Sequence, residues 1–240
     1  METIQKKSSI LLKDMARQQL FDKYRIVVPA YFIMQLIITL PLQLLQSLLN
    51  LNSTGGSAIY MAGYVMISLI SAVFILGQNR IYLNIARQQE FRLSNMWYGF
   101  HSHADKAILA SLIVSLKILI TGIPFFISLC IVIATRNYYI APLAGITCCL
   151  FLFASAYFQL TYSQVFYLML DFPEESAREL LARSAQLMKG NRLRFFYLRV
   201  SFLGLLILGG MSLSIGLLWV MPYMNMTMAG FYEDVRRGIE

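Results

Sequence analysis

The sequence predicts an all-α fold: a polytopic helical membrane protein with six transmembrane helices and cytoplasmic amphipathic helices. Of the 240 residues, 58% are hydrophobic and only 13% are charged, about half the charged share of an ordinary soluble domain. Apolar runs of roughly 20 residues or more, the length that a helix needs to cross a bilayer, recur along the chain. Short polar segments separate these runs, so we expect a single membrane domain over residues 1–240.

The N-terminal segment, residues 1–25, is basic and amphipathic. Six lysines and arginines precede the first long apolar run, and they alternate with apolar residues at helical spacing. Such a helix suits the headgroup layer of the inner membrane surface. The first apolar run is too long for a signal-peptide core, so we expect it to remain as a membrane span.

Six spans are predicted, over about residues 26–49, 58–83, 110–134, 140–169, 193–211 and 215–232. The last two come from one long apolar stretch, for which a single span over residues 195–220 is the alternative. Glycines at positions 209, 210 and 216 offer a turn, and two spans of about 18 residues match a thin hydrocarbon core at 1.5 Å per residue.

Charge predicts the orientation. Lysines and arginines gather at the ends of spans that face one side, with Lys117 and Arg136 as the exceptions, and all acidic residues lie on that same side. The positive-inside rule makes this side cytoplasmic and places both termini there. Between spans four and five, residues 173–189 form a charged amphipathic helix on the inner face, with Pro173 in its first turn and Gly190 at its end.

Polar side chains form a stripe on each of the first two spans. At 100° per residue, one side of span one carries Gln35, Thr39, Gln43 and Gln46, and one side of span two carries Tyr64, Ser68, Ser71 and Gln78. Amides and hydroxyls are costly against lipid. The two stripes therefore either join the two helices to each other or line a cavity.

Four further polar residues lie inside predicted spans. Gln159 and Tyr162 belong to span four, which carries polar residues on two sides and is expected at the centre of the bundle. Asn225 lies in span six. Lys117 lies in span three, where a lysine is either functional or extends its amine to the inner headgroups.

No catalytic, cofactor-binding or metal-binding signature is present, so we expect neither an enzyme nor a cofactor. The three cysteines lie in apolar runs without metal-ligand spacing. A membrane-embedded hydrolase would have to use His101, His103, Asp105 and Asp171 at the inner surface. The sequence lacks the basic patch with interleaved aromatic residues that is typical of nucleic-acid binding, so we expect no nucleic-acid partner. The expected partners are membrane lipids.

From about Ile75 onward the chain resembles a bacterial integral membrane family catalogued as domain of unknown function nine-seven-five. The matching stretches are ARQQEFRLSNMWYGF at 86–100, DFPEESARELLARSAQLMKG at 171–190 and the tail from Ser201 to Val235. The resemblance implies a six-helix bundle of the bacterial cell membrane and no established chemistry. More distantly, the chain is similar to the membrane portion of some glycerophosphodiesterases, and by that analogy a lipid or envelope role is implied.

Two functional hypotheses follow. In the first, the protein is a non-enzymatic component of transport, permeation or envelope assembly, whose polar stripes pack or line a path. In the second, it is an accessory subunit or scaffold of a larger membrane complex that a partner contacts through the helix over residues 173–189.

Overall fold

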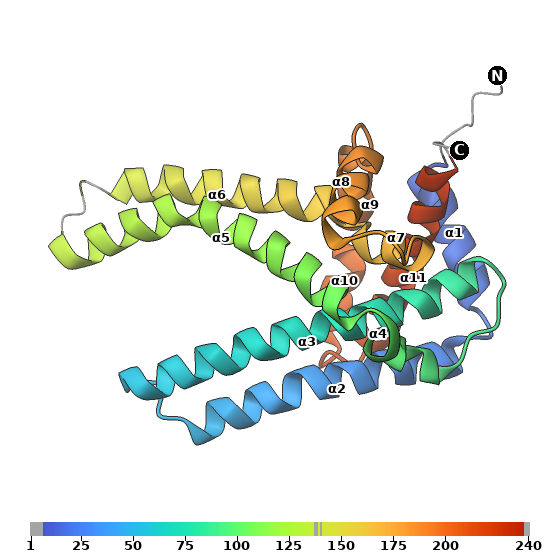
Figure 1. The fold of residues 1–240 in the computed structure, drawn as a ribbon, viewed down its shortest axis with the longest axis horizontal. Coiled ribbons are helices and arrows are strands. Elements are labelled where there is room, and N and C mark those ends of the chain that lie inside the picture. The colour runs from blue at the N-terminus through green and yellow to red at the C-terminus, as the bar shows by residue number, and fades with distance from the viewer. Residues whose placement is uncertain (1–6, 137–138, 140, 238–240) are drawn as a thin grey trace.

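The chain folds into helices throughout the part that the computed structural model describes, residues 7–136, 139 and 141–237 (Figure 1). Residues 1–6 of the predicted N-terminal segment and residue 140, the predicted start of span four, lie outside that part. In chain order the helices are α1 Ser9–Leu20, α2 Tyr24–Leu48, α3 Thr54–Ala86, η1 Leu93–Trp97, α4 Tyr98–Ser102, α5 Ala104–Thr135, α6 Ala141–Thr161, α7 Val165–Asp171, α8 Ala177–Leu187, α9 Arg192–Val200, α10 Leu203–Met211 and α11 Leu217–Arg236.

Five segments are long and apolar enough to cross a membrane: Tyr24–Leu48, Thr54–Ala86, Ala104–Thr135, Ala141–Asp171 and Arg192–Met211. They correspond to the first five predicted spans, and the second and third are extended at both ends. Span four is divided by a turn into α6 and α7, and span five is divided into α9 and α10. The C-terminal helix α11 is not among the five, so the count of six stays a prediction.

Two long hairpins, α2–α3 and α5–α6, extend from the rest of the molecule on the left of Figure 1. Their apolar side chains are largely exposed, as the arm residues Leu48, Met61, Ile120 and Phe153 illustrate. A water-soluble protein rarely exposes apolar patches of more than a few hundred Å². Because the four helices of these hairpins present this surface, and a fifth segment, Arg192–Met211, is also long and apolar enough to cross a membrane, the protein is a multi-pass membrane protein.

The packed core lies at the opposite ends of these hairpins, where α1, α7 and α11 pack against α3, α8 packs against α7 and α9 against α1 (Figure 1). Side chains there are almost fully buried, among them Leu76, Leu180, Leu198 and Phe231. At Gly77 the backbone of α3 lies against η1, because a Cβ atom at this position would stand 2.1 Å from the carbonyl oxygen of Met96.

Helix α3 contacts most of the other elements, whereas span four was expected at the centre. Only 6% of the most apolar window of Ala141–Asp171 is buried. The hydroxyls of Thr147 and Thr161 donate to carbonyl oxygens of their own helix, Leu143 at 3.0 Å and Tyr157 at 2.7 Å. The Thr147 hydroxyl also forms a hydrogen bond of 2.9 Å with that of Ser128 in α5, so these polar groups face their own backbone and one neighbouring helix instead of a surrounding bundle.

The predicted cytoplasmic helix begins later than expected. Pro173 lies in a turn before the helix, and α8 starts at Ala177 after Ser176, whose hydroxyl accepts a hydrogen bond from the backbone N–H of Glu179. The Glu179 side chain in turn accepts from the backbone N–H of Ser176, which completes a capping box. The helix ends at Leu187, two residues before the predicted end, and Gly190 follows with a φ of +80°, which favours glycine.

The N-terminal helix packs against protein along one side, whereas it was expected to lie against the membrane surface. Leu12, Ala16 and Leu20 are buried against the core, and α11 is a principal neighbour of α1. Other apolar side chains of this segment, such as Ile10 and Phe21, are exposed. The predicted turn between the last two apolar segments is confirmed, because α10 ends at Met211 and α11 begins at Leu217.

Candidate functional site

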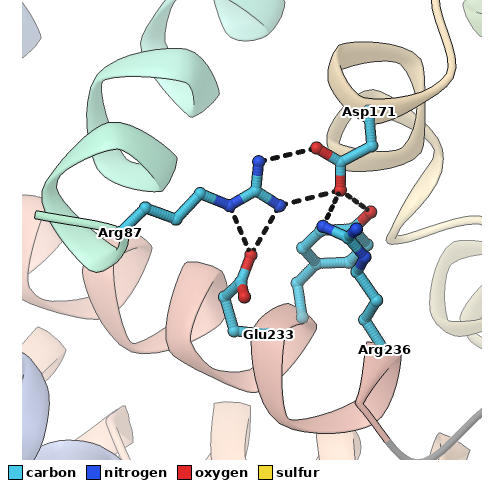
Figure 2. Close-up of polar contacts among 5 residues, drawn as sticks. Arg87, Asp171, Glu233 and Arg236 are labelled. Atoms are coloured by element: carbon cyan, nitrogen blue, oxygen red, sulfur yellow. Dashed lines mark hydrogen bonds and ion pairs between the residues drawn. The ribbon is translucent and has the colours of Figure 1, made fainter. Parts of the chain in front are cut away.

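Five charged or polar side chains meet where three helices end, and we call them the ion-pair cluster (Figure 2). Arg87 follows the last residue of α3, and Asp171 is the last residue of α7. Tyr232, Glu233 and Arg236 come from the final turns of α11. Each helix thus contributes its terminal residues, and the cluster joins parts of the chain that are far apart in sequence.

Asp171 is the centre of the ion-pair cluster. Its carboxylate receives two hydrogen bonds from Arg87, at 2.7 and 2.8 Å, one from Arg236 at 2.8 Å and one from the Tyr232 hydroxyl at 2.6 Å. Only 6% of its side chain is exposed. Paired guanidinium bonds to a buried carboxylate are among the stronger polar contacts in proteins.

Arg87 extends the cluster to a second carboxylate. Its Nε donates to Oε1 of Glu233 at 2.8 Å, so that one guanidinium joins α7 and α11 to the end of α3. The hydrogen bond to Asp171, together with the contact to Glu233, raises the pKa of Arg87 above its already high ordinary value. The carboxylates are occupied by donors from several helices, and this arrangement suits holding helices together.

A second ion pair involves the next residue of α11, Asp234, which follows Glu233. Arg194, in α9, donates to the carboxylate of Asp234 and to the carbonyl oxygen of Lys7 at 2.6 Å. The backbone N–H of Lys7 donates to the other oxygen of Asp234 at 3.3 Å. The two ends of the described chain are therefore adjacent.

A cavity of about 460 Å³ lies between α3, α5, α6, α7, α9 and α11, and we call it the central cavity. Its wall is mixed. The apolar part includes Ile75, Val114 and Phe166, and the polar part comprises Asn79, Ser111, Ser115, Gln159, Tyr162, Ser163, Tyr167, Arg199 and Asn225. Cavities of this size and character are typical of sites for small molecules.

The central cavity and the ion-pair cluster share three helices. Tyr232 connects them directly, since its ring stacks on the ring of the cavity residue Tyr167 at 5.1 Å between centroids while its hydroxyl donates to Asp171. The cluster therefore holds α3, α7 and α11 at the spacing that leaves the cavity between them.

Three of the predicted polar residues line this cavity: Gln159, Tyr162 and Asn225. A fourth, Lys117, reaches its wall from α5, because the amine donates to the Tyr162 hydroxyl at 2.6 Å and lies 4.5 Å from the centroid of that ring. Lys117 is thus paired with a neighbouring helix.

The remaining predicted residues stay outside the central cavity. The hydroxyls of Thr39, Ser68 and Ser71 donate to carbonyl oxygens of their own helices. Within the described residues no hydrogen bond connects the stripe of Gln35, Thr39, Gln43 and Gln46 with that of Tyr64, Ser68, Ser71 and Gln78. Gln78 is buried, and its amide nitrogen has no hydrogen-bond partner in the described part of the chain.

Arg199 and Asn79 are cavity residues that the sequence analysis did not single out. Arg199 offered a signal, because an arginine seven residues inside a predicted span is costly and so marks a candidate site. The residues considered for a hydrolase are not assembled: His101 contacts the carbonyl oxygen of Trp97 at 2.9 Å, whereas Asp171 belongs to the ion-pair cluster. Over the described residues, no group of three or more His, Cys, Asp or Glu side chains is placed to hold a metal ion.

Comparison with known proteins returns one family. The family described as "Protein of unknown function (DUF975)" matches residues 1–238. No curated protein and no solved structure matches the chain. The more distant similarity to the membrane portion of glycerophosphodiesterases thus stays a prediction.

Proposed function

Because the chain belongs to the DUF975 family, for which no activity is described, we propose a function from its geometry: a non-enzymatic transport or permeation component of the bacterial cell membrane. The observation that carries the proposal is the central cavity. It collects amide, hydroxyl and guanidinium groups from several helices of a membrane protein, where such groups are costly unless they are hydrogen-bonded, and where charged groups often mark a substrate site.

The ion-pair cluster supports an arrangement with six crossings. Lys7 precedes span one, Arg87 follows span two, Asp171 ends span four, and Glu233 lies at the end of α11. All four positions meet at one end of the molecule, because Arg87 contacts Asp171 and Glu233 and the backbone N–H of Lys7 donates to Asp234, the residue after Glu233. After an even number of crossings the chain is back on its starting side, so this meeting of positions supports a sixth crossing by α11. Together with the positive-inside rule, it leads us to propose that both termini are cytoplasmic.

Cysteine labelling tests this topology. In a chain with Cys130, Cys148 and Cys149 replaced by alanine, Ser214→Cys at the turn between α10 and α11 is expected to react with a membrane-impermeant maleimide added outside intact cells. Arg237→Cys is expected to react only after the cells are opened. Labelling of Arg237→Cys in intact cells would exclude the sixth crossing.

Transport is tested with purified protein in vesicles of phosphatidylethanolamine and phosphatidylglycerol. Uptake of radiolabelled sugars, amino acids and organic phosphates is compared for wild type, Gln159→Leu and Gln43→Leu. Both substitutions remove one amide, but only Gln159 lines the central cavity. Uptake that is impaired by Gln159→Leu and not by Gln43→Leu supports the proposal. If no solute is taken up, transport is excluded for these solutes and the scaffold role becomes the favoured function.

The scaffold role has its own supporting feature, a groove of about 740 Å³ beside α8. Its lining combines the carboxylates of Glu174, Glu175 and Glu179 with the apolar side chains of Leu168 and Phe172. A membrane-protein partner seated there is expected to co-purify in mild detergent with wild type and not with Ala182→Trp, which fills the groove. Ala62→Trp on the exposed arm of α3 is the control.

A further inference from the structure

Arg199 is the cation of the central cavity, and nothing in the described chain neutralises it. It forms no hydrogen bond and no ion pair within residues 7–136, 139 and 141–237, and its guanidinium lies 5.6 Å from the ring centroid of Phe195. The two other arginines of α9 differ: Arg194 is paired with Asp234, and Arg192 lies over the ring of Tyr157 at 4.6 Å. An arginine inside a candidate span normally has an anionic or carbonyl partner.

The described wall of the central cavity contains no carboxylate. Arg199 lies seven residues after the start of the span Arg192–Met211, about 10 Å along it at 1.5 Å per residue. Its side chain is exposed, so a ligand can reach the guanidinium. The missing countercharge must then come from outside the described chain, and an anionic ligand is the simplest source.

The neighbouring groups favour an anion with several oxygen atoms. The amides of Asn79, Gln159 and Asn225 and the hydroxyl of Ser111 lie in the same wall and can all donate hydrogen bonds. Tyr162 is a further donor, because the Lys117 amine already donates to its oxygen at 2.6 Å and the hydroxyl proton remains available to a ligand. A guanidinium matches the oxygens of phosphate with two parallel bonds.

From these lining groups we infer that the central cavity binds a phosphate-bearing ligand whose phosphate is held by Arg199. The inference deepens the proposed function, because it rests on the cavity being a ligand site and names the ligand's chemical class. Two sources share this chemistry: a phospholipid that enters from the bilayer with its chains on the apolar wall at Val114 and Phe166, and a soluble phosphate or phosphate ester.

The test is direct binding to the full chain, purified in neutral detergent and freed of lipid. The probes are phosphatidylglycerol, glycerol phosphate, inorganic phosphate and, as the phosphate-free control, diacylglycerol. Binding is measured by native mass spectrometry and by the shift of the melting temperature. Binding of phosphatidylglycerol but not of the soluble probes identifies the bilayer as the source, and the reverse identifies the aqueous phase; either result supports the inference.

Variants connect the binding to Arg199. Arg199→Gln is expected to weaken binding about tenfold to hundredfold, the loss of one charge-assisted hydrogen-bonding group. Arg199→Lys keeps the charge without the two parallel bonds and is expected to lie between Arg199→Gln and wild type. Arg178→Gln, an exposed arginine of α8, removes the same charge outside the cavity and should bind as wild type does. Unchanged melting temperature without ligand verifies that each variant folds.

The inference is overturned if diacylglycerol binds as well as the phosphate-bearing probes, or if Arg199→Gln binds them as wild type does. Its failure is distinct from a failure of transport. Phosphate binding that depends on Arg199, without uptake of any solute into vesicles, would keep the ligand site and remove transport. Uptake of an uncharged solute without phosphate binding would keep the transport function and exclude the phosphate site.

Discussion

Arg87 and Asp171 are 84 residues apart in sequence, yet their side chains form two parallel hydrogen bonds of 2.7 and 2.8 Å (Figure 2). The pair joins the end of α3 to the end of α7, and Glu233 and Arg236 attach α11 to it. The relationship has two consequences. It brings the ends of three helices to one side of the molecule, and it spaces the helices that line the central cavity.

Replacing Arg87 by glutamine is expected to lower the stability of the folded protein by about 2–3 kcal/mol. Loss of one partner of a buried ion pair costs about 3–5 kcal/mol, and Arg236 still compensates Asp171 here. The Arg87 side chain is also 23% exposed, which reduces the effect further. The control is Arg92→Gln, whose partner Glu90 is 90% exposed and whose loss should cost less than about 1 kcal/mol. Thermal unfolding in detergent measures both, and equal melting temperatures would contradict a role of the cluster in stability.

Gly77→Ala is expected to destabilise the packing of α3 against η1. Its new methyl group would stand 2.1 Å from the Met96 carbonyl oxygen, so the two backbones must separate, and forced overpacking typically costs about 1–3 kcal/mol. Gly204→Ala in α10 is the matched control, because no atom lies within 4 Å of its added Cβ. A melting temperature of Gly77→Ala equal to that of Gly204→Ala would mean that the close approach does not occur.

The contributions of Lys117 and Tyr162 to the free energy of unfolding are expected to be coupled. Because the amine donates to the hydroxyl at 2.6 Å, Tyr162→Phe leaves the charge without this acceptor, and Lys117→Met leaves the hydroxyl without this donor. The double variant should therefore lose less stability than the sum of the two single variants, by about 1 kcal/mol. Additive losses in a double-mutant cycle would indicate that the Lys117 amine reaches the headgroups instead.

The capping box of α8 predicts a pH dependence. Hydrogen bonds with Ser176 lower the pKa of Glu179 from its ordinary value of 4.5, so the ionised side chain stabilises the helix start fully above pH 4.5 and loses this effect as the pH falls through the lowered pKa. Hydrogen exchange of the amides at 177–179 is expected to be faster in Glu179→Gln than in wild type at pH 7, and the difference should disappear in strong acid. A difference that persists there would exclude ionised Glu179 as its cause.

The helices themselves could be predicted because their causes are local. Apolar runs of membrane length, the glycines around position 209 and the basic residues at span ends place α2, α3 and the turn before α11 within four residues. In contrast, α5 begins six residues before its predicted start and α6 ends eight residues before its predicted end. The start of α8 was misplaced by four residues, because the Ser176 capping box prevailed over the preference of Pro173 for a first turn.

Pairing between distant segments depends on tertiary structure alone. The sequence indicated that Gln159, Tyr162 and Asn225 avoid lipid, but only packing brings them around one cavity with Arg199, while the stripes of α2 and α3 stay outside it. Periodicity along a helix specifies which side of that helix is polar and says nothing of which other helix faces it. The length and polarity of each helix were thus determined by neighbouring residues, whereas the contacts of Arg87 with Asp171 and Glu233 depend on how whole helices pack.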